Sequence, residues 1–420
     1  MIRLLTALAA FLLGGPTLAE TVLIRNATVH TMADTGTLEG ADILVRDGTI
    51  EAIGRALAAP AQARIIDAQE RPVTPGFFGG LTHLGLEEIG LEPTAEDAAL
   101  KLGTMRPEFD VALAFNPDSV AIGVSRVEGV TFAVIVPTAE AGSSKAPGGT
   151  IIAGQGSVVA LNGGAATDSR ALFLDFGADA NELSGGSRAA QYMLLKQAFL
   201  EARTPKAVLP DDQRLLTPAG RQTLLDFIGG AGPFVFDVDR AADIRQVLAF
   251  ARREKLRIAL SGGAEAWRVA SELAAARVPV ILDGLEDLPL GLDSIGATLE
   301  NAARLERAGV DVAFTMDSPE PHNVRKLRQT AGVAVAHGLP WDAALAGLTR
   351  VPAEIFGVAD RFGTIERGHR ANLVVWSGDP LEVTSFATHV FVDGVQQADR
   401  SRQTELRDRY LERVRAGTAR

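Results

Sequence analysis

Eight short apolar runs in the middle of this chain constrain its fold more than any other feature. Each run has the length of one strand, and apolar residues on both faces are typical of a parallel sheet that helices cover. Helix-like stretches lie between the runs, for example at residues 241–254 and 266–276. This alternation predicts an α/β fold with a closed (β/α)8, TIM-like barrel. The expected strands begin at Val73 and continue at residues 131–137, 151–161, 171–176, 233–239, 257–261, 279–282 and 311–316.

The two ends of the chain have a strand-and-turn character instead. Near the N-terminus, the pair Asp47-Gly48 favours a tight hairpin because both residues tolerate positive φ. Alternating strands return after about residue 364, at residues 372–376 and 389–394. We therefore predict a small β-sandwich domain formed by both chain ends (residues 20–72 and 364–400), a barrel of residues 73–363 and a charged C-terminal helix at residues 401–420.

The first 19 residues have the features of a secretory signal peptide. Arg3 is followed by an apolar run, and Ala19 is a small residue suited to cleavage. A membrane anchor is the alternative, but the apolar run is only about half as long as the roughly 20 residues that a span needs. We expect an exported protein, periplasmic or secreted, without a membrane span after removal of the signal.

Charge and cysteine content narrow the partners and the chemistry. A formal net charge of −11 argues against a nucleic-acid partner, because nucleic-acid binding relies on basic surfaces. The absence of cysteine excludes disulfides and thiolate catalysis.

Several short motifs follow one another along the chain in a characteristic order. Residues 74–77 (Thr-Pro-Gly-Phe) precede residues 82–85 (Thr-His-Leu-Gly), and Asp317-Ser318 ends the eighth strand. Together with Gly129-Val130-Thr131, Gly363 to Gly368, Ala371 to Val374 and Val392-Asp393-Gly394, this set resembles the amidohydrolase superfamily, in particular its exported imidazolonepropionase-like and dihydroorotase-like members. The resemblance implies a hydrolase of non-peptide or cyclic-amide C–N bonds that acts on a small-molecule substrate or ligand, and family precedent adds a homo-oligomer to the expected partners.

The resemblance also implies a metal centre at the C-terminal mouth of the barrel. Family members bind one or two divalent metals there, and a bound metal lowers the pKa of its water. Their ligands are a His-x-His pair on strand 1, a carboxylated lysine or glutamate on strand 4, histidines on strands 5 and 6, and an aspartate on strand 8. His83 matches the second histidine of the pair. Asp317 matches the aspartate, which in the family also takes the proton from the attacking water.

The other ligand positions depart from the family pattern. Leu81 stands in place of the first histidine, Asp237 near the strand-5 position and Ala264 near the strand-6 position, and no strand-4 ligand is placed. Two hypotheses follow. One is a hydrolase with a reduced site in which His83 and Asp237 bind one zinc or manganese ion and Asp317 is the base. The other is a metal-free pseudoenzyme that acts as a ligand-binding or partner subunit.

Each candidate has a structural alternative. His83 could be a leftover histidine that is hydrogen bonded in the barrel mouth, and Asp317 could pair with Arg325. Asp239 and Glu265 could join Asp237 in an oxygen-rich pocket, but Asp239 could instead cap the helix that follows it. His322 lies in a loop five residues beyond Asp317, where it could touch a substrate or lie exposed.

Overall fold

A computed structural model describes residues 20–90, 92–100, 102, 105–140, 150–204 and 213–418 of the chain. The predicted signal peptide at residues 1–19 lies outside these described residues.

An eight-stranded sheet forms the centre of the molecule and follows chain order from β6 to β13. The α/β barrel is confirmed, and a strand is found in each expected region. The first expected strand is divided at Gly76, so that Val73 belongs to β5 (Pro72–Pro75) of the second sheet and the first barrel strand begins at Phe77. The first and last strands approach each other, because the Leu81 N–H donates a hydrogen bond to Thr315 Oγ1 at 3.0 Å. The strands are β6 (Phe77–Thr82), β7 (Val130–Ile135), β8 (Ile152–Ala160), β9 (Arg170–Asp175), β10 (Phe234–Val238), β11 (Ile258–Gly262), β12 (Val280–Asp283) and β13 (Val312–Thr315).

Strand β8 runs against the direction expected for an all-parallel barrel. It pairs antiparallel with both β7 and β9. The connection from β8 to β9, residues 161–169, contains turns and no helix. A parallel neighbour would need a crossover of roughly a dozen residues or more, so this short connection fixes the antiparallel direction.

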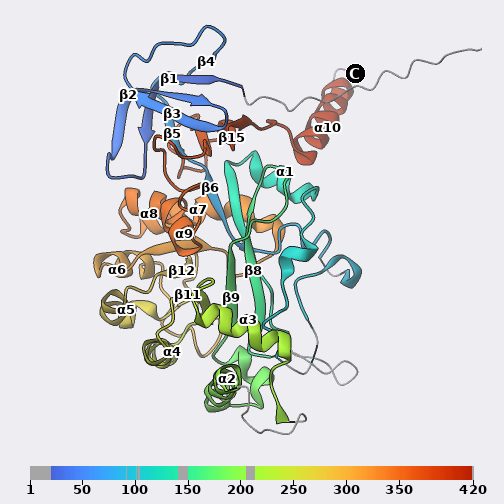
Figure 1. The fold of residues 1–420 in the computed structure, drawn as a ribbon. Helices are drawn as coiled ribbons and strands as arrows, with labels where there is room; N and C mark the ends of the chain where they lie inside the picture. The colour runs from blue at the N-terminus through green and yellow to red at the C-terminus, as the bar shows by residue number, and fades with distance from the viewer. Residues whose placement is uncertain are drawn as a thin grey trace, which may run out of the picture.

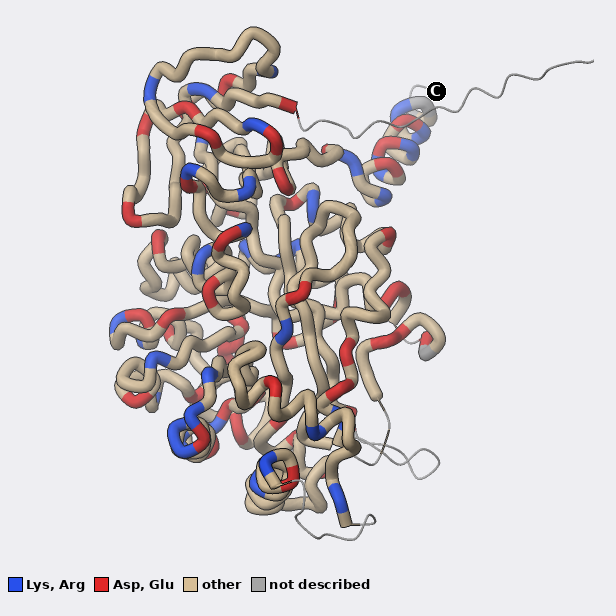
Figure 2. The backbone as a smooth tube through the Cα atoms, in the orientation of Figure 1, with Lys and Arg blue, Asp and Glu red and all other residues tan. Residues whose placement is uncertain are grey.

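Helices surround this sheet (Figure 1). In α4 (Ala241–Glu254), the residues Ile244, Val247, Leu248 and Ala251 are buried at a helical spacing that turns one face towards the strands. The remaining α-helices around the barrel are α1 (Val120–Arg126), α2 (Arg188–Arg203), α3 (Pro218–Ile228), α5 (Ala270–Ala276), α6 (Asn301–Arg307), α7 (Leu327–Ala336), α8 (Trp341–Gly347) and α9 (Arg350–Ile355). Short 3-10 helices are η1 (Pro93–Ala95), η2 (Val111–Ala114), η3 (Asp179–Ser184), η5 (Ala266–Val269) and η6 (Pro321–Lys326). Charged residues lie mostly on the outer helices and loops, as Figure 2 shows.

Both ends of the chain meet in a second eight-stranded sheet. The N-terminal β5 pairs antiparallel with the C-terminal β14, and the β2–β3 turn contains Asp47 and Gly48 at positive φ, as the sequence predicts. The exact division into domains stays a prediction. The strands are β1 (Val22–His30), β2 (Thr37–Arg46), β3 (Thr49–Gly54), β4 (Arg64–Asp67), β5 (Pro72–Pro75), β14 (Leu373–Trp376), β15 (Ala387–Val392) and β16 (Val395–Gln396).

Trp376 joins the second sheet to the barrel. Its indole N–H donates to Thr74 Oγ1 at 2.9 Å, and its ring packs against Phe77 of β6. Gly129, just before β7, has a φ of +89°, and a Cβ there would lie 2.5 Å from the Trp376 ring. Only glycine therefore allows this close packing.

The C-terminal helix α10 (Arg402–Thr418) lies beside α1 (Figure 1). Among the helices of the described residues, none has the length and apolar character required to cross a membrane.

Candidate functional site

A cavity of about 180 Å³ opens among the strand ends of the barrel. Its floor is apolar and includes Leu81 and Phe173. Its polar lining residues are Thr138, Asp175, Asp237, Ser261, Thr315 and Asp317. A larger open groove of about 700 Å³ lies between residues 32–37 and helices α8 and α9, but no barrel strand contributes to it. Barrel enzymes build their sites at the C-terminal strand ends, so the smaller cavity is the candidate site.

Strand register places three polar side chains next to one another on the cavity wall. Asp175 at the end of β9 is the Cα partner of Asp237 on β10, and Asp237 is in turn the partner of Ser261 on β11. Parallel strands in register direct paired residues to the same face of a sheet. All three side chains therefore face the cavity together, and the Asp237 carboxylate accepts a hydrogen bond from the Ser261 hydroxyl.

The paired aspartates both have raised pKa values. Burial, followed by the negative charge of Asp239, raises the pKa of Asp237 to about 7, although the hydrogen bond from Ser261 acts in the opposite direction. Protein surrounds this carboxylate, but the residue remains exposed to solvent through the cavity. Burial and the charge of Asp237 also raise the pKa of Asp175, against a hydrogen bond from the Ala139 N–H. Two neighbouring carboxyl groups of this kind resist simultaneous ionisation.

Two more carboxylates, Asp283 and Glu286, lie near the cavity at the end of β12. The Asp283 carboxylate accepts hydrogen bonds from the N–H groups of Leu285 at 2.8 Å and Asp317 at 3.0 Å. Burial, and then the charges of Asp239 and Asp317, raise the pKa of Glu286 to about 8. Neither lysine nor arginine lines the described cavity, so its electrostatic potential is negative.

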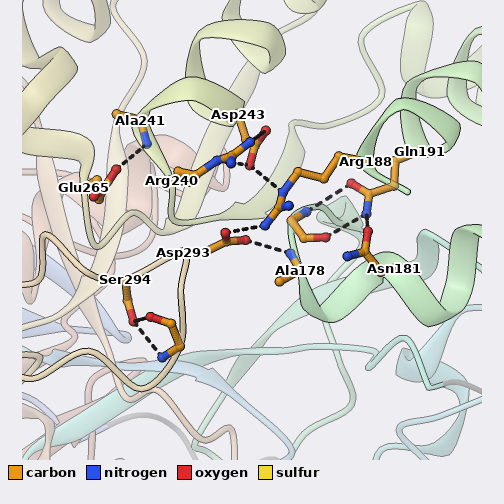
Figure 3. A network of polar contacts seen from close by, with 12 residues as sticks. Ala178, Asn181, Arg188, Gln191, Arg240, Ala241, Asp243, Glu265, Asp293 and Ser294 are labelled. Carbon is orange, nitrogen blue, oxygen red and sulfur yellow. Dashed lines mark hydrogen bonds and ion pairs between the residues drawn. The ribbon is translucent and has the colours of Figure 1, made fainter. Parts of the chain in front are cut away.

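A polar network connects the loop after β12 with the segment between β9 and α2 (Figure 3). The Asp293 carboxylate accepts a hydrogen bond from the Ala178 N–H at 2.7 Å and forms an ion pair with Arg188. Arg188 also contacts Asp243 of α4 at 3.1 Å. These contacts join the loop after β12 to the loop after β9 and to α4.

His83 lies directly behind the cavity wall rather than in its lining. Its Nε2 atom is 2.8 Å from the hydroxyl oxygen of Thr138, and its Nδ1 atom is 3.5 Å from a carboxylate oxygen of Glu87. Burial lowers the pKa of His83 to about 4, and the charge of Glu140 offsets part of this effect. The ring is therefore neutral at pH 7.

Asp317 lines the cavity, as the sequence predicts for the end of the eighth strand. The alternative pairing with Arg325 is not observed among the described residues, because Arg325 donates a hydrogen bond to Gln403. Asp237 also lines the cavity, and Leu81 occupies the wall where the family pattern has its first histidine.

Asp239 and Glu265 have structural roles outside the cavity lining. The prediction that Asp239 caps α4 is wrong: Asp239 Oδ1 accepts a hydrogen bond from the Ala264 N–H at 3.1 Å. Glu265 caps the helix instead, because its Oε2 atom accepts a hydrogen bond from the Ala241 N–H at 3.1 Å (Figure 3). Glu265 also contacts Arg268 at 3.4 Å.

The two remaining sequence candidates also lie away from the cavity lining. His322, on η6, is 63% exposed and contacts Glu320 at 3.3 Å. Ala264 lies beyond the end of β11, so Ser261 is the residue that β11 presents to the cavity.

Sequence reasoning missed Asp175 and Thr138, although each had a recognisable signal. Asp175 occupies the end of the apolar run at residues 171–176, and Thr138 follows the run at residues 131–137. Polar residues at strand ends are the positions from which barrel enzymes draw their functional groups.

The donor set does not fit the metal centre that the family resemblance implies. Leu81 offers only an alkyl group, and His83 Nε2 is already hydrogen bonded to Thr138. Within the described part of the chain, no three His, Cys, Asp or Glu side chains are grouped so that they could hold a metal ion. Catalytic zinc sites use about three protein ligands, with histidine prominent among them.

Comparisons with known proteins point to one family. The family model described as "Amidohydrolase family" matches residues 242–397. The structure of an amidohydrolase from Thermotoga maritima MSB8 is 27% identical, with a TM-score of 0.79, and the match covers 90% of this chain and 100% of that one. The chain belongs to the amidohydrolase superfamily.

Two other proteins match this chain to a more limited extent. Amidohydrolase tasK from Hapsidospora irregularis is 36% identical over 91 residues, which are 22% of this chain but only 9% of that relative's length. A molinate hydrolase structure is 14% identical, with a TM-score of 0.55 and coverage of 91% and 95% of the two chains, and this likeness shows the fold alone. Members of the superfamily are in general hydrolases and use divalent metals.

Proposed function

We propose that this amidohydrolase cleaves an amide or cyclic-amide C–N bond of a small molecule held in the barrel-mouth cavity, with its own side chains supplying the proton transfers. The observation that carries this proposal is the pairing of Asp175 and Asp237 on the wall of that cavity. A cavity of about 180 Å³ is smaller than the roughly 300 Å³ at which drug-sized pockets begin, so the reacting part of the substrate must be compact.

Asp237 is suited to the proton transfers of this reaction. Amide hydrolysis requires a proton for the leaving nitrogen and removal of a proton from the attacking oxygen. Its pKa of about 7 means that both protonation states are populated at neutral pH. The protonated carboxyl gives its proton to the leaving nitrogen, and the resulting carboxylate regains one from the water that is consumed.

The surrounding carboxylates select the substrate. With no lysine or arginine in the lining, the cavity favours neutral or cationic groups and disfavours anions. In this proposal Asp317 accepts a hydrogen bond from a substrate N–H, and Ser261 and Thr315 offer hydroxyl groups on the same wall.

A second candidate function is binding without turnover. It is favoured by the apolar Leu81 at the first histidine position and by the hydrogen bond that occupies His83. The protein would then be a metal-free pseudoenzyme that binds a small neutral or cationic ligand in the same cavity.

One experiment separates the two functions. The purified protein is incubated in chelator with a panel of small cyclic amides, and ring opening is followed by mass spectrometry while binding is followed by calorimetry. Turnover that falls at least about 100-fold in Asp237→Asn, but not in the exposed control Asp226→Asn on α3, supports hydrolysis. Binding without turnover supports the pseudoenzyme, and the absence of both rejects the cavity as a functional site.

A further inference from the structure

Three side chains at the barrel mouth form a chain of polar contacts that leads into the cavity. Glu87 contacts His83 Nδ1 at 3.5 Å, and His83 Nε2 is 2.8 Å from the Thr138 hydroxyl oxygen. The order carboxylate, imidazole, hydroxyl is the order by which hydrolytic triads activate a hydroxyl nucleophile.

Only the hydroxyl end of this chain of contacts reaches the cavity. The side chains of His83 and Glu87 are only 12% and 13% exposed, and neither lines the cavity. Thr138 lines it, together with Asp175, Asp237 and Asp317. The hydroxyl is thus the only one of the three groups that a bound substrate would meet.

The contacts also define the protonation pattern. If Nδ1 carries the proton towards Glu87, Nε2 is left as an acceptor for the Thr138 hydroxyl. A contact of 3.5 Å is long for a hydrogen bond, as is common in catalytic sites without substrate, and it would shorten when the ring becomes charged.

The described residues contain three further threonine–histidine pairs, which show why position matters. In β15 of the second sheet, Thr388 lies 3.2 Å from the adjacent His389. Thr37 lies 3.0 Å from His30, and Thr364 lies 3.0 Å from His369. Both threonines line the large groove beside α8 and α9 rather than the barrel mouth. Of these four hydroxyl–imidazole pairs, only that of Thr138 shares a cavity with Asp237.

We propose that Thr138 is a nucleophile, with His83 as its base and Glu87 as a positioning residue, and that the substrate carbonyl is transferred to Thr138 Oγ1 as an acyl ester. This inference rests on the proposed function, whose chemistry it completes. It also gives His83 a role other than the metal ligand that the family resemblance implies.

The reaction balances in two halves. In the first, the Thr138 hydroxyl proton moves to His83 Nε2, an O–C bond forms and the C–N bond breaks, and Asp237 gives its proton to the leaving nitrogen. In the second, water attacks the ester and loses a proton to Asp237, and the departing Thr138 oxygen takes back the proton of His83. One water is consumed, and every side chain returns to its starting state.

A p-nitrophenyl acetate experiment tests the nucleophile without knowledge of the natural substrate. The protein is incubated with the ester in chelator, quenched in acid and mapped by peptide mass spectrometry. We expect one acetyl group on Thr138 and none on Thr37 or Thr364. The acylation rate should fall at least about 100-fold in Thr138→Val and His83→Gln, and should persist in Thr138→Ser and in the control Thr37→Val.

Glu87 requires a separate readout, because a positioning residue and a merely structural one can both affect stability. Glu87→Gln should lower kcat for C–N hydrolysis without changing KM, and Glu87→Asp should restore part of it while thermal melting remains similar in both variants. A loss of kcat that simply follows a loss of folded protein would remove Glu87 from the proposal.

The outcomes distinguish this inference from the proposed function. Unchanged acylation in Thr138→Val, or label only at other residues, overturns the nucleophile. Cyclic-amide hydrolysis that survives in folded Thr138→Val also overturns it and leaves the proposed function intact. Acylation of Thr138 without any C–N turnover by the wild type supports the nucleophile and rejects the proposed function.

Discussion

Asp175 and Asp237 are direct partners on the neighbouring parallel strands β9 and β10, and both side chains open into one cavity. Such adjacency is electrostatically unfavourable when both groups are charged, and among the described lining residues none is basic and could compensate it. Natural sequences usually retain an unfavourable pairing of this kind for function, and perturbed carboxyl groups in a cleft are the expected signature of a site.

The pH dependence of stability should reveal the aspartate pair. The pKa of Asp237 is raised from an ordinary 3.8 to about 7, so the folded state binds its proton more tightly than the unfolded state does. Its contribution to stability is therefore complete below about pH 4 and is lost as the pH rises towards 7. After allowance for solvent contact through the cavity, Asp237→Asn should gain about 1 kcal/mol relative to wild type at pH 8 and nothing at pH 4. Urea denaturation at both pH values measures this, and an equal effect at the two pH values would contradict it.

Activity should also depend on the protonation of Asp237. If this carboxyl is the proton donor, kcat/KM for a cyclic amide should fall about tenfold per pH unit above pH 7. Between pH 5 and pH 7 the neutral His83 should add no further limb, since its pKa is lowered to about 4. A pH–rate profile checks both statements, and a limb near pH 6.5 would indicate a solvent-exposed histidine instead.

Metal content should be low in the wild type and should respond to position 81. The described donors are not grouped as a metal site, so dialysed protein should contain well below one equivalent of zinc or manganese and should keep its Tm in chelator. Leu81→His restores the second nitrogen of the strand-1 pair and should raise zinc retention, as measured by elemental mass spectrometry. Stoichiometric metal in dialysed wild type would overturn our interpretation of the donor set.

Glu265 should matter for stability and not for turnover. Because it caps α4 through the Ala241 N–H, Glu265→Ala should lower the free energy of unfolding by about 1–2 kcal/mol. Hydrolysis by the folded variant should equal that of wild type, since Glu265 does not line the cavity. A selective loss of kcat at full folding would place Glu265 in the site after all.

Gly129 should tolerate no side chain. Its φ of +89° would strain any other residue, and an added Cβ would overlap the Trp376 ring at a distance of 2.5 Å. Gly129→Ala should therefore destabilise the protein by at least about 2 kcal/mol, measured by thermal or urea melting. Gly123→Ala in nearby α1, where a Cβ meets no atom within 4 Å, is the matched control and should be neutral or stabilising.

The barrel strands were predictable because apolar runs identify buried strands, and all eight are found. The direction of β8 was not predictable from its apolar run, since such a run has the same pattern in either direction. The shortness of the segment at residues 161–169 was the available clue.

The site was predictable only in part. Asp237 and Asp317 line the cavity because they end strands, whereas Ala264 was placed three residues too far along. Gly262 and Gly263 both have positive φ, so the chain turns away after Ser261. The contact between His83 and Thr138 joins two strands, and no local sequence pattern contains that information.

The pairing of β5 with β14 has a consequence for how the chain reaches its native state. β5 pairs with the early strand β1 on one side, but its partner on the other side is made more than 290 residues later, since Val73 and Val375 are partners. Gly76 alone separates β5 from β6, so the first barrel strand shares this delay. Folding of the second sheet cannot be completed as the N-terminal part of the polypeptide emerges, and a prematurely terminated product would leave one edge of β5 unpaired and prone to aggregate.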